Sequence, residues 1–333
     1  MDEALISLKQ AAGQYGVAYD RIRRAAYDGR LLCARVENRW MVRPSEVERF
    51  IGAGGRAPQP EPRPRREGTA DGRVIAVALP KGGTGKTTVT LNLGAALVEA
   101  GQRVLLVDSD PGANLTDTLN YVPQRGDWTL QTAIEHYIKE FEPCLHQAIT
   151  TTAEGLDLVP ADADLGSSEE GLRGALDPQR VLLNLLDPLR SLYDIILIDT
   201  MPYLGVLVQN ALVAANEVLV PIQAQAQATE AAKKLLTQSS LIIRSRLNPQ
   251  LQIAGFLFTQ VDASELNQRE QMAYSRRVFG REHRVFSTMI EDRAVIRESQ
   301  LQVVRQSLFR FRPTDVATQA FRALAKEVLD GTA

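Results

Sequence analysis

Residues 79–90 read LPKGGTGKTTVT, and this stretch decides the fold. It follows the apolar run VIAVAL at residues 74–79, which predicts a buried strand, and it opens a helical pattern from about Lys86 to Ala100 that Gly101 ends. Three glycines between a strand and a helix N-terminus favour a loop whose backbone N–H groups surround a phosphate. The alternative is a glycine-rich turn that holds no ligand.

The loop offers the side chains that a phosphate site with a metal ion needs. Lys86 is expected to reach the β- and γ-phosphates, and the Thr87 hydroxyl is expected to bind Mg²⁺. The general pattern GxxxxGK[ST] requires glycine where this chain has Pro80, so the strict pattern is not met. The loop residues expected to surround the phosphates are Gly82, Gly83, Thr84, Gly85, Lys86, Thr87 and Thr88.

After residue 72, short apolar runs alternate with helical stretches. Runs this apolar are buried on both faces, which is typical of parallel strands between two layers of helices. The sequence therefore predicts an α/β fold with a parallel twisted sheet covered by helices. The expected strands are residues 74–79, 104–108, 156–160, 194–199, 217–221 and 253–258.

A linker divides the chain. In residues 52–71, glycine and proline supply 8 of 20 residues and no apolar periodicity remains, which is typical of an extended linker. Residues 1–56 carry 10 basic against 7 acidic residues, although the whole chain has a net charge of −2. A basic N-terminal piece favours nucleic acid as its partner. The predicted parts are residues 1–51, a linker at 52–72, and residues 73–333.

The N-terminal part has the pattern of a winged helix-turn-helix. Capping boxes at Ser7 and Ser45 predict two helix starts, a second helix is expected from Tyr19 to Tyr27, and residues 31–42 predict a hairpin. The pattern resembles excisionase-like or MerR-like DNA-binding domains, although Ala18 replaces the usual cap of the second helix. A structural or protein-binding role is the alternative. The arginines expected to contact DNA are Arg21, Arg23, Arg24 and Arg39, whereas Trp40 is expected to pack the hairpin.

The loop itself matches KGGxGKTT, so the chain resembles the ParA/MinD family of P-loop ATPases with a deviant Walker A loop. The resemblance covers roughly residues 73–329. It implies that ATP and Mg²⁺ are the cofactors and that two ATP-bound subunits close face to face. It also implies that Lys81 contacts the phosphates of the partner subunit, which explains a second lysine in the loop. A fixed cation at that place stabilises the charge of the transferring phosphoryl group.

Further matches imply roles for three carboxylates. The resemblance places Asp110 where relatives orient the attacking water, Asp108 where it helps to hold Mg²⁺ through a bound water, and Asp199 at the end of the Walker B strand as an outer-shell Mg²⁺ ligand. Together with Lys81 and Lys86, Asp110 completes the expected catalytic set. Helix capping after a strand is the alternative for each aspartate. The matching segments are residues 104–116, 193–200, 210–223 and 255–263.

The chain also departs from the family pattern. Gly112 and Ala113 replace Gln and Gly in the DPQGN segment, and Gln225 stands where relatives often have Glu, so slow hydrolysis is expected. Glu291 replaces a proline that is common near the adenine. Residues 262–265 lack the DxRT sequence by which many relatives anchor on DNA.

Other basic residues are candidates for that missing DNA anchor. Arg276 and Arg277 are the expected contacts, and the alternative is that these residues are solvated helix faces. The two candidate groups are Lys233, Lys234, Arg244 and Arg246, and Arg276, Arg277, Arg281 and Arg284.

The sequence predicts a ParA-type ATPase that segregates plasmids or chromosomes. In this hypothesis an ATP-bound homodimer binds DNA, a centromere-binding ParB-like partner stimulates hydrolysis, and the N-terminal part adds autoregulatory DNA binding. The main alternative is a transcriptional regulator that uses ATP as a switch without segregating DNA. The expected location is the cytoplasm, in association with the nucleoid.

Two further classes of relative fit the sequence less well. A MinD-like membrane ATPase ends in a basic amphipathic helix, but residues 314–329 offer only Arg322 and Lys326 as cations, so a docked core helix is expected. No apolar run approaches the roughly 18 residues that span a bilayer. A nitrogenase-reductase-like protein needs cysteines for a shared cluster, and Cys33 and Cys144 do not have that pattern.

Overall fold

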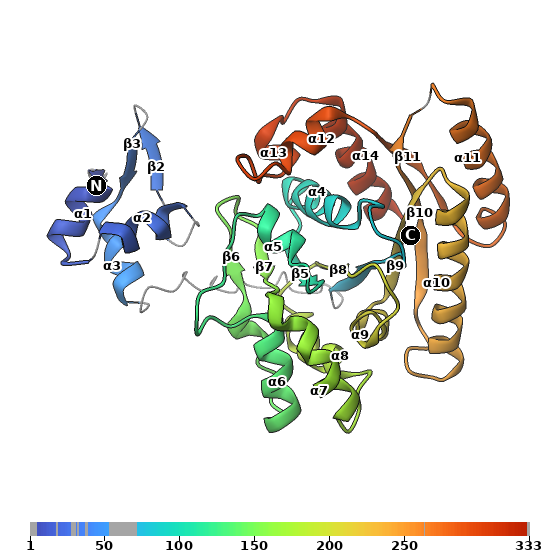
Figure 1. Cartoon of the computed structure of the whole chain (residues 1–333), viewed down its shortest axis with the longest axis horizontal. Coiled ribbons are helices and arrows are strands. Elements are labelled where there is room, and N and C mark those ends of the chain that lie inside the picture. The colour runs from blue at the N-terminus through green and yellow to red at the C-terminus, as the bar shows by residue number, and fades with distance from the viewer. Residues whose placement is uncertain are drawn as a thin grey trace.

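The computed structural model describes residues 5–17, 19–27, 31, 33–36, 39–52, 72–262 and 264–331. Within residues 72–331, the described strands form a sheet in the order β11-β10-β9-β4-β8-β5-β7-β6 (Figure 1). All neighbouring pairs in this order are parallel except the short antiparallel pair β6 and β7. The strands are β4 (Arg73–Val77), β5 (Val104–Ser109), β6 (Thr150–Thr151), β7 (Asp157–Val159), β8 (Ile195–Thr200), β9 (Glu217–Gln223), β10 (Gln252–Val261) and β11 (Val285–Glu291).

Helices cover both faces of the sheet, as the apolar runs predict. Along β4, Val74 and Ala76 pack into one core, whereas Ile75 and Val77 pack into the other. The first core lies under α6 (Leu130–Glu140), α7 (Ser168–Gly174), α8 (Val181–Leu186), α9 (Val206–Ala214), α10 (Ala226–Arg244) and α11 (Leu266–Phe279). The second lies under α4 (Lys86–Glu99), α5 (Asn114–Thr118), α12 (Ala294–Ser299), α13 (Leu308–Phe311) and α14 (Val316–Asp330). The expected α/β fold is thus confirmed.

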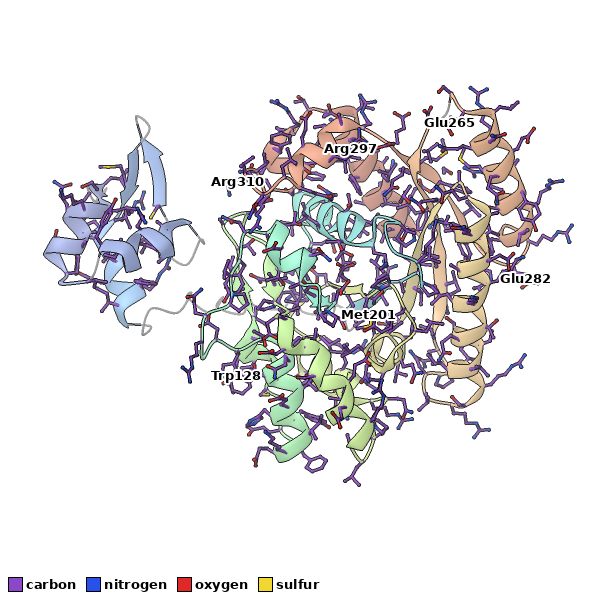
Figure 2. The ribbon with its side chains drawn as sticks, in the orientation of Figure 1. Trp128, Met201, Glu265, Glu282, Arg297 and Arg310 are labelled. Atoms are coloured by element: carbon purple, nitrogen blue, oxygen red, sulfur yellow. The ribbon has the colours of Figure 1, made fainter. Side chains whose placement is uncertain are left out.

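Short 3₁₀ helices complete the connections between these elements. They are η1 (Leu145–Ala148), η2 (Ala163–Ser167) and η3 (Asp187–Leu189). Side chains fill the space between sheet and helices: Met201, which follows β8, is buried, whereas Glu282 and Arg297 lie at the surface (Figure 2).

The six expected strands are all present, and the sequence pattern missed β6 and β11. β11 is an edge strand, parallel to β10, in which Phe286 and Ile290 are buried while Ser287 and Glu291 are exposed. A strand with one solvated face lacks the continuous apolar run by which the buried strands are found. The C-terminal helix α14 packs Phe321, Leu324 and Val328 into the core, which agrees with the expected docked helix.

The helix α4, which follows the glycine-rich loop, packs closely on the sheet. A Cβ atom on Gly94 would stand 2.6 Å from the Leu106 side chain of β5, so only glycine lets the helix approach this closely. Because α4 directly follows β4 in the chain, its N-terminus lies at the carboxyl end of β4, where ligands bind in open α/β sheets.

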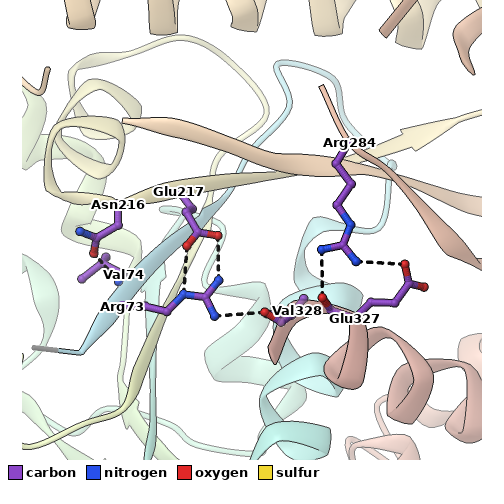
Figure 3. Close-up of polar contacts among 7 residues, drawn as sticks. All are labelled: Arg73, Val74, Asn216, Glu217, Arg284, Glu327 and Val328. Atoms are coloured by element: carbon purple, nitrogen blue, oxygen red, sulfur yellow. Dashed lines mark hydrogen bonds and ion pairs between the residues drawn. The ribbon is translucent and has the colours of Figure 1, made fainter. Parts of the chain in front are cut away.

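At the amino ends of the strands, Arg73 and Arg284 form hydrogen bonds with residues of α14 (Figure 3). Arg73 of β4 donates to both carboxylate oxygens of Glu217 on β9, at 2.9 and 2.8 Å, and to the carbonyl of Val328 at 3.1 Å. Arg284 donates to the Glu327 carbonyl at 3.0 Å and to its carboxylate at 3.4 Å. The partly buried, bidentate Arg73–Glu217 pair thus joins β4 to β9, whereas the Val328 carbonyl and the more exposed Glu327 contacts tie α14 to the sheet.

The N-terminal residues form the expected order of helix, helix, hairpin and helix around a core of their own. The Ser7 capping box with Gln10 and the second helix over Tyr19–Tyr27 are confirmed. The predicted third helix is also confirmed, although α3 begins at Pro44, one residue before Ser45, because the fixed φ of proline suits a first helical turn. The elements are β1 (Ile6–Ser7), α1 (Leu8–Gln14), α2 (Tyr19–Tyr27), β2 (Cys33–Val36), β3 (Arg39–Val42) and α3 (Pro44–Gly52).

Several expectations fall on residues that the structure does not describe. They concern the cap at Ala18, the hairpin turn at residues 37–38, the linker at residues 53–71, and Ala263. The side chains of Arg21, Arg24, Arg39 and Trp40 also lie outside the described part, although their backbones belong to α2 and β3.

Candidate active site

The loop between β4 and α4 has the backbone geometry of a phosphate cradle. Gly83 and Gly85 have φ angles of 71° and 80°, in the left-handed region that glycine adopts without strain. Gly85 is the N-cap of α4, so the first backbone N–H groups of that helix have no carbonyl acceptor within the helix. Together with the helix dipole they favour an anion at this place.

A cavity of about 550 Å³ opens in front of the loop. One wall is the loop itself, a second wall is α5 with the segment before it, and a third wall is the segment after α12. The lining residues are Gly82, Gly83, Thr84, Gly85, Lys86, Thr87, Thr88, Asp110, Asn114, Asp117, Thr118, Pro202, Gln260, Gln300, Gln302 and Arg305. All the expected nucleotide-binding residues except Lys81 line this cavity.

Lys86 lies inside the site and is only 7% exposed. Its ammonium group donates to the backbone carbonyl of Lys81 at 3.0 Å. Burial lowers the pKa of Lys86, and the nearby charges of Asp199 and Asp110 partly oppose that shift. A buried ammonium group with a single carbonyl acceptor retains donors for phosphate oxygens.

Two buried carboxylates stand side by side at the ends of neighbouring strands. Asp108 of β5 and Asp199 of β8 are register partners, and both are fully buried. The Thr87 hydroxyl donates to Asp199 at 2.7 Å. Burial, together with the charge of Asp108, raises the pKa of Asp199, and burial likewise raises the pKa of Asp108. The pair therefore needs a positive charge nearby to stay ionised.

These donors fit Mg²⁺. Hard carboxylate and hydroxyl oxygens are its usual protein ligands, and one or two of them normally act together with substrate phosphates and water. In the described residues, no group of three or more His, Cys, Asp or Glu side chains forms a self-sufficient metal site. Thr87 and Asp199 would hold the ion beside a phosphate, and the ion would neutralise charge there.

Asp108 and Asp110 differ in what they can reach. The Asp108 carboxylate accepts from the backbone and the hydroxyl of Thr116, at 2.9 and 2.7 Å, and from the Asp110 backbone at 3.2 Å. Asp108 therefore also fixes α5, as the capping alternative expects. Asp110 lines the cavity, and its carboxylate accepts from Gly112 at 2.8 Å. Asp110 is thus the aspartate of this segment that lines the cavity.

The altered segment after Asp110 has a strained residue. Ala113, which stands where relatives have glycine, has a φ of 49° and serves as the N-cap of α5. An L-residue in this region costs roughly 1 to 2 kcal/mol. A Cβ on Gly112 would stand 2.9 Å from the amide of the exposed Asn114 side chain, so a side chain at this position requires Asn114 to move.

Lys81 points away from the cavity. Its ammonium group donates to Gln223 and to Gln225, each at 2.7 Å. Gln223 ends β9, and Gln225 is the N-cap of α10. Sequence reasoning noted Gln225 only as a replacement for Glu, and it missed Gln223. Both glutamines lie far from Lys81 in the sequence, and glutamine carries no periodic or charge signal, so no sequence pattern pointed to these contacts.

A second cavity of about 220 Å³ adjoins the first and shares Gly85, Thr88, Gln260 and Gln300 with it. Its apolar lining comes from Val89, Ile290 and Ile296, and Glu291 also lines it. Gln300 donates to the Thr88 hydroxyl at 2.6 Å. An apolar slot with polar groups at its rim, next to a phosphate cradle, suits a nucleotide base. The expected place of Glu291 near the base agrees with this.

Comparison with known proteins assigns the family. A family model described as an AAA domain matches residues 72–253. The chain is 35% identical over 257 residues to the chromosome-partitioning ATPase Soj of Thermus thermophilus, which covers 77% of this chain and 95% of Soj. The chain belongs to the ParA family of P-loop ATPases. A further relative, an uncharacterised protein of Mycobacterium tuberculosis, is 36% identical over 283 residues, or 84% of this chain and 86% of the relative.

Solved structures support the ParA-type fold. The structure of cobyrinic acid a,c-diamide synthase from Mycobacterium smegmatis with bound ADP and magnesium is 30% identical and has a TM-score of 0.65. It covers 78% of this chain and 94% of that chain. Together these relatives support the ParA-type ATPase that the sequence predicts.

The candidate DNA contacts whose side chains the structure describes lie on α11 and α2. Arg276 and Arg277 are exposed on α11, and the Arg276 guanidinium lies 5.2 Å from the centre of the Phe258 ring. Arg23 is exposed on α2, with its guanidinium 5.9 Å from the Tyr19 ring centre. Arg284 is engaged by Glu327, so it is a weaker candidate for DNA.

Proposed function

We propose that this ParA-type ATPase segregates plasmid or chromosomal DNA by pairing as a homodimer when it binds ATP and Mg²⁺. The paired form binds DNA, and a ParB-like centromere-binding partner stimulates hydrolysis. Lys81 of each subunit contacts the triphosphate of the other subunit, as the deviant Walker A pattern implies. In this proposal the protein works in the cytoplasm, on the nucleoid.

One observation carries the proposal: the two lysines of the loop have different surroundings. Lys86 is buried and lies among the residues that line the cavity, whereas the ammonium group of Lys81 lies outside that lining and contacts neutral amides. A cation kept at the rim, with no carboxylate paired to it among the residues that the structure describes, suits a role toward a second subunit. The relatives named as chromosome-partitioning ATPases support the same reading.

The residues of the site account for the chemistry. Lys86 and the loop N–H groups hold the β- and γ-phosphates, and Thr87 with Asp199 holds the magnesium-bound side of the triphosphate. Asp110 faces the cavity and orients the attacking water. Mg²⁺, when bound, neutralises phosphate charge. Lys81 from the partner supplies a further cation for the transition state, and the altered segment at Gly112 and Ala113 makes hydrolysis slow.

The N-terminal unit adds a second mode of DNA binding in this proposal. Its helix, helix, hairpin and helix order, with Arg23 exposed on α2, fits a winged reader that binds a specific site for autoregulation. The same unit favours the second candidate function, an ATP-switched transcriptional regulator without a segregation role. In the described residues, no helix is long and apolar enough to cross a membrane.

ATP turnover separates these two functions. The full chain is assayed with Mg-ATP alone, with non-specific DNA, and with DNA plus a candidate centromere-binding protein. A segregation ATPase is expected to be slow alone and to accelerate when both are present. Turnover that neither addition changes, combined with nucleotide-dependent binding to one promoter, would favour the regulator instead.

A further inference from the structure

The Lys81 ammonium group is held by its own subunit through two side-chain amides. It donates to the side-chain Oε1 of Gln223 at 2.7 Å and to the side-chain Oε1 of Gln225 at 2.7 Å. Burial lowers the pKa of Lys81, and these acceptors compensate for the water that the ammonium group has lost. The lysine that is proposed to act on a second subunit is therefore engaged in its own.

One of the two acceptors, Gln223, is itself fixed to the phosphate loop. The Gln223 amide donates to the carbonyl of Gly83 at 3.2 Å and to the side chain of Gln260 at 2.6 Å. Gln260, which has a left-handed φ of 53°, donates to the same Gly83 carbonyl at 2.7 Å. A non-glycine residue in that region marks a constrained position. Hydrogen bonds with Gln260 and the Gly83 carbonyl thus hold Gln223 in place as an acceptor for Lys81.

The chemistry of the two glutamine acceptors suits reversible release of the Lys81 ammonium group. A charge-assisted hydrogen bond to an amide is shorter and stronger than one between neutral groups, but an amide lacks the full charge of a carboxylate. Phosphate oxygens of a nucleotide carry that charge, so they attract an ammonium group more strongly than glutamine does. The balance favours the glutamines in a lone subunit and the triphosphate in a closed pair.

We propose that Gln223 and Gln225 form a latch that holds Lys81 on its own subunit and releases it only to the triphosphate of a partner. This inference rests on the proposed function, since it assumes that Lys81 acts across the dimer. Release of Lys81 from the two glutamines costs free energy when two subunits pair. The latch therefore weakens nucleotide-dependent dimerisation. Loosening the latch should make pairing easier, whereas a merely supporting role of the glutamines predicts the opposite.

Gln225 is the better residue to test. Gln223 also supports Gly83, so its loss disturbs the phosphate loop, whereas the Gln225 side chain donates or accepts in the described part of the chain only toward Lys81. Gln227 gives a matched control, because it is an exposed glutamine in the first turn of the same helix and does not contact Lys81 among the described hydrogen bonds. The variants are Gln225→Ala, Gln227→Ala and Lys81→Ala.

Two measurements on the full-length variants test the latch. In analytical ultracentrifugation with Mg²⁺ and a non-hydrolysable ATP analogue, Gln225→Ala is expected to pair about tenfold more tightly than the parent, a change of about 1.4 kcal/mol. In the nucleotide-free protein, acetylation of Lys81 followed by peptide mass spectrometry is expected to be severalfold faster in Gln225→Ala. Gln227→Ala should behave as the parent in both.

The two proposals fail in different ways. If Lys81→Ala prevents pairing but Gln225→Ala pairs no more tightly than the parent, the latch is wrong and the proposed function stands. If Lys81→Ala pairs as the parent does, the proposed role of Lys81 fails, and the latch fails with it because no cation needs release. Tighter pairing of Gln225→Ala, together with faster acetylation of Lys81, supports the latch.

Discussion

The Lys86 ammonium group donates a hydrogen bond to the backbone carbonyl of Lys81 at 3.0 Å, so one short turn joins the two lysines of the loop. From this turn Lys86 points into the cavity, and Lys81 points out toward Gln223 and Gln225. Two cations that lie five residues apart are thereby separated into an inner and an outer position. Their substitutions should have separable effects.

The first prediction concerns nucleotide affinity. Lys86→Ala is expected to lower the affinity of the full chain for Mg-ATP about 10- to 100-fold, because a charged hydrogen-bond donor to phosphate is lost. Lys81→Ala should leave the affinity of the single subunit nearly unchanged and should abolish pairing. Isothermal titration calorimetry at low protein concentration measures the first effect, and sedimentation measures the second.

Lys234→Ala is the control for both lysine variants, because Lys234 is an exposed lysine of α10 and does not line the cavity. It should bind nucleotide and pair as the parent does. An equal loss of nucleotide affinity in Lys81→Ala and Lys86→Ala would contradict the separation into inner and outer positions.

The second prediction concerns Asp199 and pH. Burial, with the charge of Asp108, raises the pKa of Asp199 to about 8 in the folded chain, against an ordinary value of 3.8. Because the folded state then binds more protons than the unfolded state, stability in the absence of nucleotide should fall as the pH rises from about 4 to about 8. Asp199→Asn should remove that fall and stabilise the nucleotide-free protein at pH 8 by roughly 1 to 3 kcal/mol.

Thermal melting of metal-free protein at pH 5 and at pH 8 measures this effect. The gain from Asp199→Asn should be larger at pH 8 than at pH 5, and addition of Mg-ATP should stabilise the parent more than the variant. The variant should also lose magnesium-dependent turnover. An equal gain at both pH values would show that the carboxylate is not held neutral by its surroundings.

The fold was predictable because its strands are buried on both faces. Runs such as residues 104–108 and 194–199 are nearly continuous in apolar residues, so they stand out without any knowledge of the topology. β11 was missed since only one of its faces is buried, and its serine, threonine and glutamate interrupt the run. The start of α3 was misplaced because proline and serine both mark helix starts, and sequence alone does not rank them.

The part of the candidate site that lies within a single loop was predictable from the sequence. Gly82 to Thr88 carry their own signal, and the carboxyl ends of parallel strands bring Asp108 and Asp199 together. The contacts of Lys81 were not predictable, since Gln223 and Gln225 lie far from it in sequence. Glutamines carry no periodic or charge signal, so only the fold shows what they hold.

The third prediction concerns the strained alanine before α5. Ala113→Gly removes a left-handed conformation of an L-residue, which costs roughly 1 to 2 kcal/mol, but it also adds freedom to the unfolded chain, which costs about 0.4 to 1 kcal/mol. A net stabilisation of roughly 0.5 to 1 kcal/mol is expected by urea unfolding. Ala175→Gly is the control, because Ala175 follows α7 in an extended conformation and glycine relieves no strain there. Stabilisation of both variants, or of neither, would contradict this account.

The fourth prediction concerns the proposed DNA surface on α11. Arg277 is exposed there, so Arg277→Ala is expected to weaken binding of the ATP-bound protein to DNA of any sequence and to lower the salt dependence of binding by about one phosphate contact. Arg276→Ala should do the same and also lower stability by about 0.5 to 1 kcal/mol, because its guanidinium stacks on Phe258.

Lys326→Ala is the matched control for α11, since it removes one exposed positive charge from a different helix, α14. Fluorescence anisotropy with a labelled duplex at several salt concentrations gives the slope for each variant. If the slopes of Arg277→Ala and Lys326→Ala are both equal to that of the parent, α11 does not contact phosphate. The stretch from Lys233 to Arg246 would then be the next basic candidate to test on this part of the chain.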